Sequence, residues 1–290
     1  MKIPWMLLLI CLLALGLAAC ARSGPEAAEA PEEEMPEDTV PDNFGAEEFS
    51  VEHDGRTIYG TLYVPSRHEE KVPAVILSHS ANLTSDSMRS YGERLAAQGY
   101  VAYAFDFCGG SKKSRSDGDP ADMTVFTEME DLKAVLAAIR NLEYVDEQAV
   151  FLFGTSQGGL VSALVADECP DDVKGLILFY PAFNLAELAQ KYCGKLPTTT
   201  DRLFYSSLLE YDVYEHIGAF PGDVLILHGS RDFIVPYSYS ERAAECYAHC
   251  TLIKIDGASH GFNSENYAVG GNFDEETWSY AVRYLEDHTA

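Results

Sequence analysis

The sequence predicts an α/β fold, in which a mostly parallel β-sheet is covered by helices on both of its faces. Short runs rich in Val, Ile, Leu and Phe recur along the chain, and segments with helical periodicity separate them. These runs are apolar at consecutive positions rather than at alternate ones, which is typical of strands buried on both faces. With 290 residues, the chain is long enough for one large domain or two small ones.

The expected elements follow one another in a regular order. Alternating segments at residues 49–51 and 57–64 flank Asp54-Gly55 and predict a β-hairpin. A helix is expected from about residue 85 to 98, where Gly99 ends it. A second helix at residues 126–142 places four apolar residues on one face: Leu132, Val135, Leu136 and Ile139. Further strands are expected at residues 74–77, 101–105, 150–153, 176–179, 224–227 and 252–255, and further helices near residues 160–166, 238–248 and 275–286.

One connection is longer than a simple crossover between strands requires. Roughly forty residues separate Tyr180-Pro181 from Val224. They include five aromatic residues, namely Tyr192, Phe204, Tyr205, Tyr211 and Tyr214. Such residues either line a substrate cap or pack the insertion onto the domain. We therefore expect a short cap insertion at about residues 184–222.

The N-terminus predicts export. Lys2 precedes a run without charge that extends from Ile3 to Ala21, which indicates a signal peptide or an uncleaved anchor, since the run is about long enough to span a bilayer. Leu17-Ala18-Ala19-Cys20 is similar to the bacterial lipoprotein signal, in which lipid is attached to the cysteine, and this favours lipid attachment at Cys20 over ordinary secretion.

These features divide the chain into three parts. We expect a signal peptide at residues 1–19, an acidic linker rich in Pro and Glu at residues 20–46, and the folded domain at residues 47–290. The lipid would tether that domain to a membrane outside the cytoplasm, at the cell surface or on the periplasmic side.

Composition excludes some classes of function. The chain has 20 Lys and Arg against 46 Asp and Glu, for a formal charge of −26. Phosphate binding needs clustered cations, so nucleic acid is excluded as a partner. The seven cysteines match neither a zinc pattern nor a dense disulfide scaffold. We expect mostly reduced thiols, and neither a metal ion nor an organic cofactor.

Residues 154–159, Gly-Thr-Ser-Gln-Gly-Gly, lie between a predicted strand and a predicted helix. They match G-x-S-x-G, a sharp turn that exposes a serine hydroxyl above the end of a sheet. The serine sits in a strained conformation, and side chains two positions on either side would collide in so tight a turn. This context predicts Ser156 as a nucleophile.

A serine hydroxyl is a poor nucleophile until a base takes its proton. His260 fits best, because it lies in the loop after the last predicted strand, at the sheet edge where Ser156 would point. His79 and His228 also end predicted strands. We expect them to shape loops through hydrogen bonds, since neither occupies the late position in the chain that is expected for the histidine of a triad.

The acid that orients the base is expected after the strand at residues 224–227. Asp232 lies there and could hold the second imidazole N–H. The order Ser156, Asp232, His260 is that of α/β-hydrolases and excludes chymotrypsin-like and subtilisin-like orders.

Two backbone N–H groups should stabilise the oxyanion. We expect that of Gln157, directly after the nucleophile, and that of Ala81 in the loop Ser78-His79-Ser80-Ala81, with Ser80 as the alternative.

From about residue 47 to 287 the chain resembles the α/β-hydrolase superfamily, and within it the bacterial cinnamoyl/feruloyl esterase-like branch. The shared features are His79, residues 105–111, Asp117-Gly118, Met123-Thr124-Val125, and residues 154–159, 228–232 and 257–262. Where that family usually reads His-Gly and a bulky residue, this chain reads His79-Ser80-Ala81. No residue of the insertion matches the groups that bind phenolic hydroxyls in feruloyl esterases, and Glu187 is only nearby.

The resemblance implies that Ser156, Asp232 and His260 are catalytic. We expect an extracytoplasmic serine hydrolase that cleaves small-molecule carboxylic esters through an acyl-enzyme. A dipeptidyl-peptidase-like serine peptidase shares this fold and triad, although the chain has no room for the propeller domain that such enzymes usually carry. A lipoprotein that binds a ligand under its cap without catalysis is the third alternative.

Overall fold

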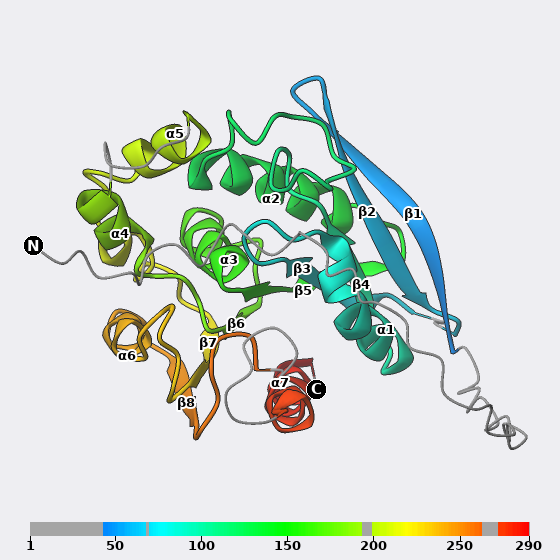
Figure 1. Ribbon diagram of the computed structural model, residues 1–290. Coiled ribbons are helices and arrows are strands. Elements are labelled where there is room, and N and C mark those ends of the chain that lie inside the picture. The colour runs from blue at the N-terminus through cyan, green and yellow to red at the C-terminus, as the bar shows by residue number, and fades with distance from the viewer. Residues whose placement is uncertain (1–42, 68–69, 193–198, 263–271, 290) are drawn as a thin grey trace, which may run out of the picture. The chain divides into compact units, whose positions relative to one another are not determined.

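The computed structural model of the protein describes residues 43–67, 70–192, 199–262 and 272–289 (Figure 1). The predicted signal peptide and the lipid site at Cys20 lie outside these residues, so both stay predictions. No helix in the described part of the chain is long and apolar enough to cross a membrane.

The described residues form an eight-stranded sheet with the strand order β1-β2-β4-β3-β5-β6-β7-β8. The hairpin of β1 (Phe44–His53) and β2 (Arg56–Pro65) is antiparallel, and β2 joins β4 (Val101–Phe105) in the same sense. All other neighbouring strands are parallel, which confirms the predicted fold class. These strands are β3 (Val72–Ser78), β5 (Val145–Thr155), β6 (Gly175–Phe179), β7 (Asp223–Gly229) and β8 (Cys250–Ile255).

Strand β1 begins at Phe44, three residues before the expected boundary of the folded domain at residue 47. Phe44 already pairs with Pro65, and Ser66 N–H donates to Asn43 O at 2.7 Å. The register of the hairpin includes Gly45 and Ala46, which pair with Val64 and Tyr63 although the expected boundary places them in the linker.

Helices cover both faces of the sheet (Figure 1). Buried residues of α2 (Val125–Arg140) and α3 (Gln157–Glu168) belong to one hydrophobic cluster, and those of α1 (Arg89–Ala97) and α7 (Asp274–Thr289) belong to a second. The helix predicted from residue 85 begins as a 3₁₀ turn, η1 (Ser85–Met88).

The helix predicted at residues 238–248 ends earlier. Helix α6 spans Ser238–Ala244, and β8 begins at Cys250. Cys246 therefore lies after the end of α6, and Cys250 is the first residue of β8. Both are free thiols, as are Cys108 and Cys169.

The insertion between β6 and β7 contains α4 (Leu185–Tyr192), α5 (Thr199–Ser207) and η2 (Val213–His216). Its aromatic residues pack against the core cluster, namely Phe204, Tyr205, Tyr211 and Tyr214. Tyr211 illustrates this, since its ring lies 5.0 Å from that of Phe126 on α2 and 4.4 Å from that of His216. For these four of the five aromatic residues considered, the structure shows packing onto the domain.

Candidate active site

Ser156 occupies the turn between β5 and α3. Its backbone has φ 50° and ψ −114°, a conformation that residues other than glycine rarely adopt and that costs free energy. The surrounding backbone holds it there. Ser156 N–H donates to Phe179 O at 2.9 Å, and Ser156 O accepts from Ala182 N–H at 2.9 Å and from Leu160 N–H at 3.2 Å.

The two glycines of the motif are required by close backbone contacts. A Cβ atom on Gly154 would lie 2.2 Å from Gly158 O, and a Cβ atom on Gly158 would lie 2.3 Å from Ser78 O. Both distances are far below any van der Waals contact. The distance from Gly158 shows that the first turn of α3 lies directly against the backbone at the end of β3. The loop that is expected to supply the second oxyanion donor begins there.

The structure brings Ser156, His260 and Asp232 together. His260 Nε2 lies 3.0 Å from Ser156 Oγ, and His260 Nδ1 lies 2.6 Å from Asp232 Oδ2. Each of the three residues is less than one tenth exposed. Because the carboxylate faces Nδ1, that nitrogen carries the proton and donates it, which leaves Nε2 to accept from the serine hydroxyl.

Four contacts surround the carboxylate of Asp232. Its Oδ1 accepts from the N–H groups of Ile234 at 2.9 Å and Val235 at 2.8 Å, and its Oδ2 lies near His228 Nε2 at 3.2 Å as well as near His260. Burial raises the pKa of Asp232, but the hydrogen bonds with His228 and His260 outweigh it and lower this pKa to about 2. The carboxylate is therefore ionised at neutral pH.

The loops that carry Asp232 and His260 are joined through their backbones. Ser230 N–H donates to Ile255 O, and Arg231 N–H donates to Ala258 O, both at 2.9 Å. A Cβ atom on Gly229 would lie 2.3 Å from Ala258 O, so the backbones of the two segments are in direct contact. This contact sets the short distance between the imidazole and the carboxylate.

The other two histidines at strand ends have the loop-shaping contacts expected for them. His228 Nδ1 lies 2.7 Å from Ser240 Oγ, and its Nε2 lies 2.8 Å from Val235 O. Phe107 N–H donates to His79 Nε2 at 3.3 Å, so His79 Nδ1 donates to Ser80 O at 2.8 Å. Burial lowers the pKa of His79, which keeps it neutral.

The expected oxyanion donors lie on two neighbouring segments. Gln157 is the first residue of α3, so its N–H has no partner within the helix. Ser80 and Ala81 follow β3, where Ala81 is exposed and Ser80 is half-buried. Ser80 Oγ lies 2.9 Å from Thr155 Oγ1, a contact that a glycine at this position could not make. The choice between the N–H groups of Ser80 and Ala81 stays a prediction.

Sequence reasoning missed Glu128, which lies on α2 and contacts the side chain of Gln157. Burial raises the pKa of Glu128 to about 8, against the opposing effect of the hydrogen bond with Gln157, and Asp131 adds to the rise. A signal was available in the sequence. Glu128 precedes Leu132 by four residues, which places a carboxyl group on the apolar face of the predicted helix.

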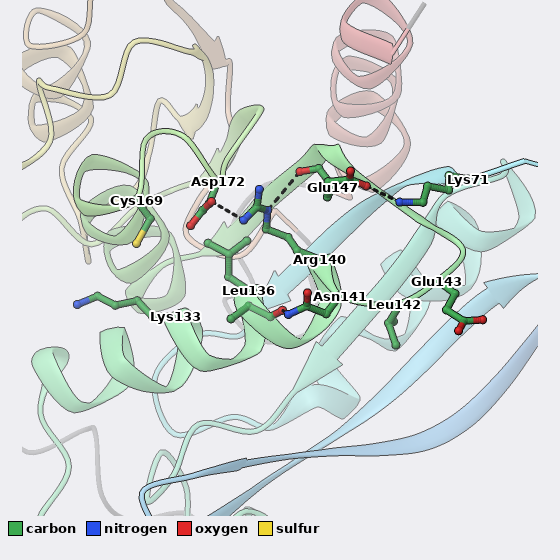
Figure 2. A pocket seen from close by; sticks show the side chains of 11 residues that line it. Lys71, Lys133, Leu136, Arg140, Asn141, Leu142, Glu143, Glu147, Cys169 and Asp172 are labelled. Atoms are coloured by element: carbon green, nitrogen blue, oxygen red, sulfur yellow. Dashed lines mark hydrogen bonds and ion pairs between the residues drawn. The ribbon is translucent and has the colours of Figure 1, made fainter.

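A surface hollow of about 480 Å³ lies elsewhere, where α2 ends and β5 begins (Figure 2). That is the amino-terminal edge of the parallel strands, opposite to the edge that carries Ser156. Its cations are paired with carboxylates: Lys71 with Glu147 at 2.6 Å, Lys133 with Glu130 at 2.7 Å and with Glu168 at 2.5 Å, and Arg140 with Asp172. The hollow therefore offers no unpaired cation to an anion. Among the described residues, no group of three or more His, Cys, Asp or Glu could hold a metal ion.

Comparison with known proteins decides the family. The family model described as "Serine aminopeptidase, S33" matches residues 69–219, just over half of the chain. The chain belongs to this family. The matched region includes Ser156 and ends before Asp232 and His260. Together with the fold, this membership makes the protein an α/β-hydrolase.

The chain is also similar to three individual proteins. The solved structure of Est1E from Butyrivibrio proteoclasticus with ferulic acid bound is 25% identical, with a TM-score of 0.70 over 82% of this chain and 98% of that one. Thermogutta terrifontis esterase 2 phosphoramylated by tabun is 22% identical, with a TM-score of 0.63 over 84% and 94%, and shows the fold. The quorum-quenching protein AidA of Acinetobacter baumannii (strain MDR-ZJ06) is 31% identical over 100 residues, which are 34% of this chain and 32% of AidA. The chain spans about a third of the length of the curated relatives that it matches.

Proposed function

We propose that this α/β-hydrolase cleaves carboxylic esters through an acyl-enzyme formed on Ser156. One observation carries the proposal: the hydrogen-bonded sequence Ser156 Oγ, His260, Asp232, with distances of 3.0 Å and 2.6 Å. A neutral imidazole accepts the serine proton at Nε2, and an ionised carboxylate stabilises the imidazolium that forms.

The proposed reaction has two stages, acylation of Ser156 and hydrolysis of the acyl-enzyme. Ser156 Oγ attacks the ester carbonyl carbon while His260 Nε2 takes its proton. The bond between that carbon and the alcohol oxygen then breaks, and His260 returns the proton to the leaving alcohol. A water molecule attacks the acyl-enzyme with His260 again as the base, and the proton returns to Ser156 as the acid product leaves.

Negative charge develops on the carbonyl oxygen in both tetrahedral intermediates. The N–H of Gln157 at the start of α3 and one N–H of Ser80 or Ala81 are proposed to donate to it. The contact between Gly158 and Ser78 O supports this arrangement, because it keeps the two segments adjacent.

Ester rather than peptide substrates are supported by similarity to Est1E, a structure that holds ferulic acid. A hydroxycinnamate substrate is not part of the proposal. Glu187 lies near the position of the phenol-binding groups of feruloyl esterases in the sequence, but it accepts a hydrogen bond from Tyr239 Oη at 2.5 Å.

A peptidase of the same fold is the second candidate, because the family description names a serine aminopeptidase. Both functions use the same three residues. A panel that sets p-nitrophenyl esters against aminoacyl p-nitroanilides separates them, since the greater kcat/KM identifies the preferred bond.

The direct test is Ser156→Ala. We expect it to lower the kcat for p-nitrophenyl butyrate by at least about 10³-fold, because the nucleophile is removed, and to abolish labelling by a fluorophosphonate probe. Circular dichroism and thermal unfolding serve as the folding control. Undiminished turnover in a folded variant would overturn the assignment, and a wild-type protein that neither turns over substrate nor takes up the probe would indicate a binding protein.

A further inference from the structure

Glu128 is a buried carboxyl group that the proposed mechanism has not used. It lies in the first turn of α2 and is 1% exposed. A buried carboxyl group lowers stability unless it is hydrogen-bonded. Its partner is the side chain of Gln157, whose Nε2 lies 2.8 Å from Oε1 and 2.8 Å from Oε2.

Gln157 is the residue that follows the nucleophile. Its side chain contacts Glu128 on α2, and Met123 Sδ, in the segment just before α2, lies 4.0 Å from its Nε2. The side chain of Gln157 is thus held in the protein interior, while its backbone begins α3 beside Ser156. Fixing both ends of the residue limits rotation of the peptide group between Ser156 and Gln157.

We propose that Glu128 is a positioning residue, which holds the Gln157 side chain and thereby aims the Gln157 N–H at the oxyanion. This inference rests on the proposed function. The contact accounts for the burial of Glu128 on a helix face that is mostly apolar, and it connects Glu128 to the residue beside Ser156.

The protonation state of Glu128 gives the inference a distinctive signature. Because burial raises its pKa to about 8, Glu128 is mostly neutral at pH 7 and ionises above pH 8. The amide of Gln157 can meet either form, since rotation presents its N–H to a carboxylate or its oxygen to a carboxylic acid.

The other charged groups near Glu128 leave its new charge uncompensated. Asp131 faces it from the same helix, and Asp131 has its own contacts with Arg56 on β2 at 3.4 Å and with Cys108 N–H at 2.8 Å. From α3 it contacts the neutral side chain of Gln157. Ionisation therefore adds a buried negative charge close to the oxyanion, and kcat should fall as the pH rises through about 8.

The experiment compares two variants with the wild type, with Ser156→Ala and with Glu130→Gln, a control on the exposed face of the same helix. Glu128→Leu keeps the approximate volume and removes the hydrogen bond. Glu128→Gln keeps a hydrogen bond and the neutral state. The kcat and KM for p-nitrophenyl butyrate are measured from pH 6 to 10, together with the rate of fluorophosphonate labelling and the melting temperature.

We expect Glu128→Leu to lower kcat and the labelling rate by about 10- to 100-fold with little change in KM. Glu128→Gln should keep most of the kcat at pH 7 and lose the fall in activity above pH 8. A purely structural role would change the melting temperature and leave the pH profile of Glu128→Gln like that of the wild type.

Two results overturn the inference: a folded Glu128→Leu variant with the kcat of the control, or identical pH profiles for Glu128→Gln and the wild type. If Glu128→Leu fails to fold, the second comparison decides alone. A wild-type protein without turnover or labelling that depends on Ser156 overturns the proposed function instead, which distinguishes the two failures.

Discussion

The two sides of Ser156 are built differently. On the side of the base and acid, two loops at neighbouring strand ends are joined by backbone hydrogen bonds, and each reacting group is a side chain within a short motif. On the oxyanion side, the proposed donors are backbone N–H groups. The contacts that hold them come from distant parts of the chain, such as Glu128 with Gln157 and Ser80 with Thr155.

This difference has a physical origin. A reacting side chain needs one residue type at one position, so its chemistry is visible in the sequence. A backbone donor needs only a direction, which almost any residue type can supply once its neighbours fix the peptide. Substitutions on the two sides should therefore differ in how much they lower kcat and in whether they remove a reacting group or displace a backbone donor.

The largest effect is expected from Asp232→Asn on the base and acid side. An amide there favours the imidazole tautomer whose Nε2 carries the proton, so that Nε2 cannot accept from Ser156. We expect kcat to fall by about 10³- to 10⁴-fold with little change in fold, measured with p-nitrophenyl butyrate.

The control for this variant is Asp256→Asn, an exposed carboxylate that accepts from Ser230 Oγ in the same pair of loops. It should retain activity. A loss below tenfold in Asp232→Asn would mean that the carboxylate does not orient the base.

An intermediate effect is expected where the two sides meet, from Gly158→Ala. The new Cβ atom would lie 2.3 Å from Ser78 O, and the obstacle is backbone, so the first turn of α3 must move. We expect about 1–3 kcal/mol of destabilisation and a loss of about 10²-fold in kcat, from thermal unfolding and ester kinetics. Gly45→Ala, where nothing lies within 4 Å of the new atom, should change neither. Equal behaviour of the two variants would show that this close contact does not constrain the site.

The smallest effect is expected from Ser80→Ala on the oxyanion side. It removes the hydroxyl that lies 2.9 Å from Thr155 Oγ1, and one such hydrogen bond contributes about 1 kcal/mol. A loss of about fivefold in kcat follows if that free energy is expressed in the transition state. Ser87→Ala, an exposed serine in η1 that donates to Thr84 O, is the matched control. A Ser80→Ala variant as active as this control would show that the hydroxyl is not needed to place the loop.

Sequence patterns predicted the sheet because consecutive apolar residues in strands such as β3 and β7 report burial on both faces. They also predicted which three side chains converge, since the strand ends that carry Ser156, Asp232 and His260 lie along one edge. Boundaries were less accurate. The hairpin register at Phe44 and the early end of α6 at Ala244 depend on tertiary pairing, which local composition does not report.

The contact between Glu128 and Gln157 is a different case. A glutamate on an apolar helix face marks an unusual position, but its partner lies on another helix, and only the packing of α2 against α3 identifies it. The same holds for Ser80, whose departure from the usual His-Gly pattern becomes understandable once Thr155 is seen beside it.

The backbone joint between the loops of Asp232 and His260 has a consequence for protein engineering. Arg231 contributes its N–H to that joint, and its side chain is exposed. Because a peptide N–H is present in every residue type except proline, position 231 can be randomised without releasing the histidine loop. Substitutions at this position would change the charge beside the proposed active site, and thus its attraction for ionic ligands, while the hydrogen bond between the two loops is kept.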